Sequence, residues 1–109
     1  MKGKITVLKR LANHDLAQKY RKEEYNQKYP LPCDAFEDGQ EFLLESMTAI
    51  PEGFCTWAWA DIHKEIVRIL TGGNNGAIIQ AGVGITCCHD GFRPVVFKIE
   101  RMDKLEGQA

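Results

Sequence analysis

The sequence carries little net charge and no long apolar run, and both absences narrow the functions open to it. Its 14 lysine and arginine residues nearly balance 15 aspartate and glutamate residues, which leaves a formal net charge of -1. Nucleic-acid-binding domains usually carry a clear basic excess, so we expect no nucleic-acid partner. No stretch approaches the roughly 18 consecutive apolar residues that a membrane-spanning helix needs, so we expect no membrane partner. Because the first residues also lack the pattern of a signal peptide, the expected location is cytoplasmic.

Motifs that mark common metal and enzyme sites are also missing. The chain has no C-x-x-C pair of the kind that usually builds a zinc site, and no glycine-rich loop with the spacing of a phosphate-binding site. Its 3 histidines suggest no catalytic dyad. We therefore assign no catalytic residue, and the sequence leaves open whether the protein is an enzyme.

What the sequence does contain is typical of a single globular domain. Of its 109 residues, 44% are hydrophobic and 27% are charged, with both signs mixed along the chain. A chain of this length can bury enough surface for one hydrophobic core. We expect one domain over residues 1–109, in which residues 12–28 form a helical insertion on the surface and residues 103–109 a flexible tail.

The clearest predicted element is a helix that begins near Cys55. Apolar residues recur at steps of four and three along one side of it, up to Ile69. Gly72 and Gly73 follow, and glycine readily takes the left-handed conformation that ends a helix. This helix has the apolar face that a core requires.

Four stretches with strand patterns predict a small sheet. The first lies within residues 4–11 and the second, a short one, over residues 41–45. Two more, over residues 83–87 and 95–99, flank an Asp-Gly hairpin turn at residues 90–91. We expect an α+β fold in which a mainly antiparallel sheet packs its apolar face on the main helix. The predicted core consists of Val7, Phe42, Trp59, Ile62, Ile66, Ile85, Val95, Phe97 and Ile99.

The 4 cysteines are the candidate chemical groups of the chain. Without a secretory signal they are expected to be reduced thiols. Cys55, in the first turn of the main helix, would meet backbone amides and the positive end of the helix dipole, which stabilise a thiolate. The alternative is that Cys55 packs as a small apolar side chain.

A metal site would have to gather Cys33, Cys55 and one of Cys87 or Cys88, with His89 or water as the fourth ligand. Neighbouring strand residues point to opposite faces, so Cys87 and Cys88 should not easily bind one ion. Zinc and iron–sulfur sites usually draw their ligands from short paired motifs, and this spacing is irregular.

Three motifs, taken in order, resemble a family of small uncharacterised prokaryotic proteins of about 100 residues with a three-cysteine pattern. They read "CDAFEDGQEFLLE", "FCTWAWADI" followed by "TGG", and "CHDGFRPVVFKIER". The resemblance implies that Cys33, Cys55 and Cys88 belong together and that Asp90 lies with them. It implies no activity. The expected neighbours of such a site are Cys87, His89 and Trp57.

Three classes of function follow from these expectations. The preferred one is a small binding or accessory protein with a cysteine-lined pocket for an unidentified small molecule or protein partner. The alternatives are a zinc or iron–sulfur binding protein, and a thiol-based redox protein or enzyme. Trp57 does not belong to the core face of the helix, so it is expected either in a pocket or at a subunit contact, and a homo-oligomer stays open.

Overall fold

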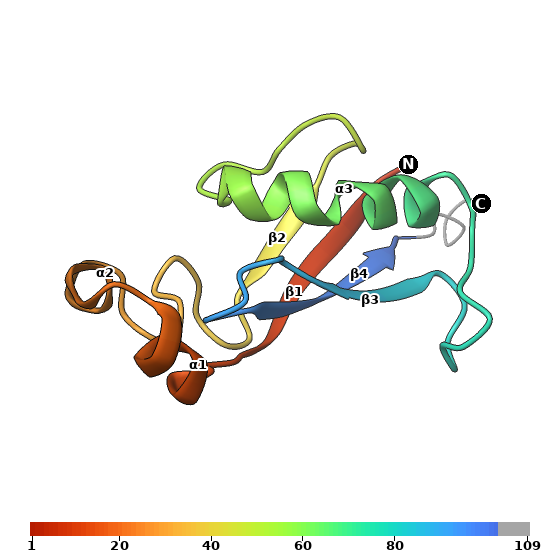
Figure 1. Cartoon of the computed structure of the whole chain (residues 1–109). Coiled ribbons are helices and arrows are strands. Elements are labelled where there is room, and N and C mark those ends of the chain that lie inside the picture. Colours follow the sequence, from red (N-terminus) through yellow and green to blue (C-terminus); the bar gives the residue numbers. More distant parts are fainter. Residues whose placement is uncertain (103–109) are drawn as a thin grey trace.

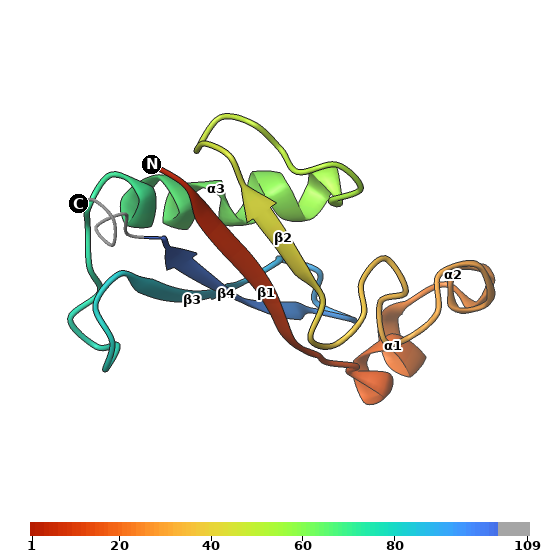
Figure 2. The ribbon, with the colours of Figure 1, turned by 180° about the vertical axis from the view of Figure 1, so that it is seen from behind.

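The computed structural model describes residues 1–102 and confirms the α+β fold. In chain order its elements are β1 (Gly3–Arg10), α1 (His14–Tyr20), α2 (Glu23–Lys28), β2 (Glu41–Leu44), α3 (Thr56–Leu70), β3 (Val83–Cys87) and β4 (Val95–Arg101). The strands form one antiparallel sheet in the order β2-β1-β4-β3. Helix α3 lies across one face of the sheet (Figure 1), and no described helix covers the other face (Figure 2). No helix within residues 1–102 is both long and apolar enough to cross a membrane.

The two central strands carry the sheet's half of the core. Ile5 pairs with Ile99 and Val7 with Phe97 across β1 and β4, so all four side chains point to the α3 side. Each of them is at most 1% exposed. Apolar side chains therefore alternate along both strands as the sequence predicts, so that one face of the sheet is buried and the other faces solvent.

Helix α3 supplies the other half of the core. Ile62, Ile66 and Ile69 are each at most 1% exposed, as their spacing along one helix face predicts. The helix then stops as expected, because Gly72 adopts a left-handed conformation with φ of 97°. The N–H group of Gly73 donates to the carbonyl of Arg68 at 2.8 Å, which is the hydrogen bond that closes a Schellman cap.

The predicted core is wrong at Ile85, which is 42% exposed. In the register of the β3–β4 pair, Ile85 lies opposite Lys98 on the open face of the sheet, whereas Gly84 lies opposite Ile99 on the α3 side. Alternation along an edge strand therefore marks the strand but does not say which face is buried. Trp59, also assigned to the core, is only partly buried and packs against its edge.

The register with β4 turns Gly84 toward α3, where a larger residue would collide with Glu65. A Cβ atom on Gly84 would lie 3.0 Å from both Cγ and Cδ of Glu65. The Glu65 side chain is only 11% exposed and pairs with Arg68 at 3.1 Å. It would therefore have to leave a packed position to make room.

We expect Gly84→Ala to lower the free energy of unfolding by about 1–3 kcal/mol, the usual effect of overpacking. Chemical denaturation measures it, and Gly76→Ala, where an added Cβ meets nothing within 4 Å, is the matched control. In a Glu65→Ala background the loss should largely disappear, because the colliding side chain is gone. An equal loss in both backgrounds would contradict this account of the packing.

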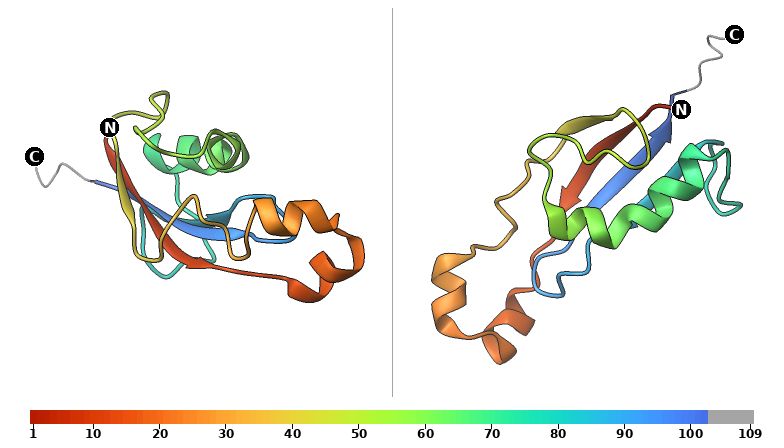
Figure 3. Two further views of the ribbon diagram at one scale, coloured as in Figure 1. Left: turned by 90° about the vertical axis from the view of Figure 1, so that its left-hand side faces the viewer. Right: turned by 90° about the horizontal axis from the view of Figure 1, so that it is seen from above.

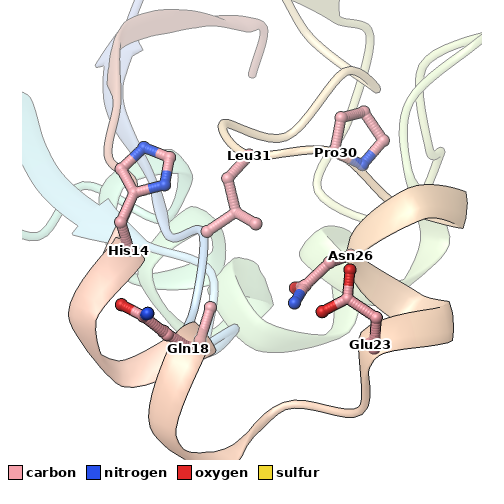
Figure 4. A pocket seen from close by; sticks show the side chains of 7 residues that line it. His14, Gln18, Glu23, Asn26, Pro30 and Leu31 are labelled. Carbon is pink, nitrogen blue, oxygen red and sulfur yellow. The ribbon is translucent and has the colours of Figure 1, made fainter.

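Residues 12–28, predicted as one helix, form the two short helices α1 and α2. The predicted helix is interrupted at Arg21, whose backbone is extended with φ of −91° and ψ of 140°. With the segment that follows them, these helices extend beyond the end of the sheet (Figure 3). A shallow depression of about 470 Å³ lies between them and the segment that follows, and His14, Gln18 and Glu23 are among the residues that line it (Figure 4). The predicted flexible tail, residues 103–109, lies outside the described residues.

A cysteine-lined cleft as candidate functional site

A cleft of about 700 Å³ opens where the first turn of α3 faces the loop after β3 and the chain around α2. Cys33, Cys55 and Cys88 all line this cleft, although they come from three separate parts of the sequence. Asp90, His89 and Trp57 line it as well. The volume falls within the roughly 300–1,000 Å³ that small-molecule sites usually have.

The three cleft cysteines differ in how they are held. Cys33 is the most buried, with 8% of its surface exposed, and its carbonyl accepts a hydrogen bond from Arg10 at 3.0 Å. Cys55 is half-buried and is the N-cap of α3, one position before the first turn in which it was expected; its side chain makes no capping hydrogen bond.

Cys88 and Cys87 point to different faces, as expected for adjacent residues at the end of a strand. Cys87 lies opposite Val96 on the open face and is exposed, so it is not part of the cleft. Cys88 is half-buried, and its Sγ accepts a hydrogen bond from the Val95 N–H at 3.3 Å. In return, the Cys88 N–H donates to the Val95 carbonyl at 3.1 Å. The paired backbone of the hairpin therefore fixes the Cys88 sulfur in place.

Asp90 is already engaged by the hairpin turn. Its Oδ1 accepts hydrogen bonds from the backbone N–H groups of Phe92 and Arg93 at 3.0 and 3.2 Å. Its Oδ2 accepts from the Arg93 guanidinium at 3.2 Å. An aspartate that binds the backbone two residues further on is typical of a turn, so the role of Asp90 seen here is to shape the cleft wall.

His89 is tied to α3 rather than to a sulfur. Its backbone N–H donates to Asp61 Oδ2 at 2.8 Å, and its ring Nδ1 lies 3.4 Å from Asp61 Oδ1. The His89 side chain is 73% exposed. These contacts fasten the loop after β3 to the main helix, which closes one side of the cleft.

Within residues 1–102, no three histidine, cysteine, aspartate or glutamate side chains are grouped so that they could hold a metal ion. The three cysteines thus share a cleft without forming a ligand cluster. The zinc or iron–sulfur alternative has no set of ligands in this part of the chain.

Much of the cleft wall is aromatic, and sequence reasoning missed this part of it. Tyr25, Tyr29 and Phe92 join Trp57, which is 84% exposed at the rim. Tyr25 and Tyr29 pack together with ring centroids 5.7 Å apart. Tyr25 belongs to the insertion and Tyr29 follows it directly. The thin apolar pattern of the insertion predicts a surface helix but not what that helix lies beside.

No protein-family model, curated protein or solved structure matches the chain. The resemblance to a three-cysteine family therefore stays a prediction. What the protein does has to be argued from the chemistry of the cleft.

Proposed function

We propose that the protein is a small binding or accessory protein whose ligand occupies the cysteine-lined cleft. The observation that carries the proposal is the convergence of Cys33, Cys55 and Cys88 on one cleft with an aromatic wall. Such clefts, mostly apolar with a few polar groups, are the usual form of small-molecule sites. Trp57 supports the proposal, because a tryptophan that is 84% exposed contributes little to the core and offers a large contact surface.

A reducing compartment such as the cytoplasm suits this function. All four cysteines are free thiols, including the exposed Cys87. Free thiols persist where glutathione and thioredoxin keep them reduced.

Thiol chemistry at Cys88 is the second candidate function. The hydrogen bond from the Val95 N–H to Cys88 Sγ favours it, since it holds this sulfur in a fixed position at the cleft wall. It ranks second because the histidine that lines the cleft, His89, contacts Asp61 and is largely exposed.

The test combines a screen with a chemical footprint. Fragment-sized aromatic compounds are screened for binding by saturation-transfer NMR, and each cysteine is then alkylated with iodoacetamide and quantified by peptide mass. We expect compounds that bind to slow the alkylation of Cys55 and Cys88 and to leave that of Cys87 unchanged, because Cys87 lies on the open face.

Cys87 is the internal control, because peptide fragment ions in the mass spectrum distinguish it from the adjacent Cys88. The binding proposal fails if no compound binds at millimolar concentration, or if those that bind protect none of the cleft cysteines. Without any compound, alkylation of the half-buried Cys88 that is faster than that of the exposed Cys87 would favour thiol chemistry instead.

A further inference from the structure

The charged side chains of the cleft indicate which class of ligand it would bind. This inference rests on the proposed binding function. We propose that the cleft takes a small organic carboxylate with an aromatic body, and that Arg21 binds the carboxylate group. Arg21 lines the cleft beside Tyr25 and Phe92.

Both aspartates of the cleft are occupied by donors of the protein itself. Asp90 accepts from two backbone N–H groups and from the Arg93 guanidinium. Asp61 accepts from the His89 backbone N–H at 2.8 Å, and its second oxygen lies 3.4 Å from the His89 ring. Neither carboxylate is left with an oxygen free of internal contacts, so neither is well placed to hold a cationic ligand.

Arg21 has no carboxylate partner among residues 1–102, in contrast to Arg93, which pairs with Asp90 at 3.2 Å. Its position is nevertheless fixed. One terminal nitrogen, Nη1, donates to Asn26 Oδ1 at 3.1 Å and to the Tyr29 carbonyl at 2.9 Å. The guanidinium carbon lies 5.6 Å from the centroid of the Phe92 ring. Arg21 is therefore an oriented cation whose remaining N–H groups are not used by the described residues.

A carboxylate is the partner that matches this group. A guanidinium presents N–H donors in a planar fork that fits the two oxygens of a carboxylate, and such hydrogen bonds are about twice as strong as those between neutral groups. The first turn of α3 contains no acidic residue, so it adds no negative side chain that would repel a carboxylate. Of the two arginines that line the cleft, Arg21 is the one without a carboxylate partner within residues 1–102.

The aromatic part of the proposed ligand is inferred from the side chains that line the cleft together with Arg21. Tyr25 and Trp57 line the same cleft and are exposed enough to contact a ligand, at 45% and 84%. Aromatic rings add favourable edge or offset contacts to the apolar area that they bury. A flat aromatic ring system with one carboxylate fits both the walls and the volume of about 700 Å³.

The experiment compares three probes of one shape: 2-naphthylacetate, its neutral amide, and 2-naphthylethylamine. Dissociation constants are measured by calorimetry and by NMR shifts of the Trp57 indole. We expect the carboxylate to bind about tenfold more tightly than the amide, and the amine to bind no better than the amide. Arg21→Gln should abolish the preference for the carboxylate while the amide binds as before.

Two further variants guard against a structural explanation. Lys22→Gln removes the same charge from the neighbouring exposed residue, which does not line the cleft, and should leave the tenfold preference in place. Arg21→Lys keeps the charge without the planar fork and should keep part of the preference.

The outcomes separate this inference from the function on which it rests. Equal binding of the carboxylate and the amide to the wild-type protein would overturn the carboxylate inference and leave the binding cleft standing. If Arg21→Gln weakened the binding of the carboxylate and of the amide equally, the inference would also be overturned, because Arg21 would then only support the cleft wall. Failure of all three probes to bind would overturn the carboxylate inference, whereas the proposed function fails only if no compound of the fragment screen binds.

Discussion

Phe97→Ala is expected to lower the free energy of unfolding by about 3–5 kcal/mol, the largest effect of any single truncation in this core. Phe97 is fully buried in the middle of β4. Its ring packs against Phe36 at 5.2 Å and against Phe54 at 5.6 Å between centroids. Truncation removes the ring and leaves a cavity between the sheet and the loops that precede α3, which the rigid strand cannot close.

The measurement is denaturation by urea, followed by circular dichroism, with Val96→Ala as the matched control. Val96 is the neighbouring residue on the same strand but faces the open side of the sheet, so its truncation should cost much less. Equal losses for the two variants would show that the faces of β4 are assigned wrongly.

Ile66→Ala is expected to cost about 2–5 kcal/mol of unfolding free energy. Ile66 is fully buried at the centre of α3, between Ile62 and Ile69 on the face that covers the sheet. Alanine is the better helix former, so any loss comes from packing and not from helix propensity.

Thermal and urea denaturation of Ile66→Ala should be compared with those of Ile79→Ala. Ile79 is fully exposed in the loop between α3 and β3, and its truncation should change stability by no more than about 0.5 kcal/mol. Near-wild-type stability of Ile66→Ala would mean that α3 does not pack on the sheet with this face.

Most of the fold could be predicted because it rests on apolar periodicity. The alternation around Ile5 and Phe97, and the helical spacing around Ile66, mark faces that must be buried together. The prediction failed at Ile85 because β3 is an edge strand, and the register with β4, rather than the strand's own composition, decides which side meets α3. Gly84 takes the inward position, and a missing side chain leaves no apolar signal.

The candidate site could be predicted only in part, and for similar reasons. The topology brings Cys33, Cys55 and Cys88 to one cleft, and their grouping is what the resemblance of their motifs implied. The contribution of Arg21 and Tyr25 could not be foreseen, because the insertion has too little apolar pattern to indicate where it packs. The contacts of Asp90 follow from the same Asp-Gly turn that identified the hairpin, although the turn alone did not show that both oxygens are engaged.

The most direct test of the ligand cleft is the alkylation rate of Cys88 relative to that of its neighbour Cys87, with and without saturating 2-naphthylacetate. The two residues are adjacent in sequence, but only Cys88 lines the cleft. We expect the probe to lower the alkylation rate of Cys88 severalfold and to leave that of Cys87 unchanged. If the bound probe slows both residues equally, or neither, it does not occupy the cleft, and the assignment of the cleft as its binding site is contradicted.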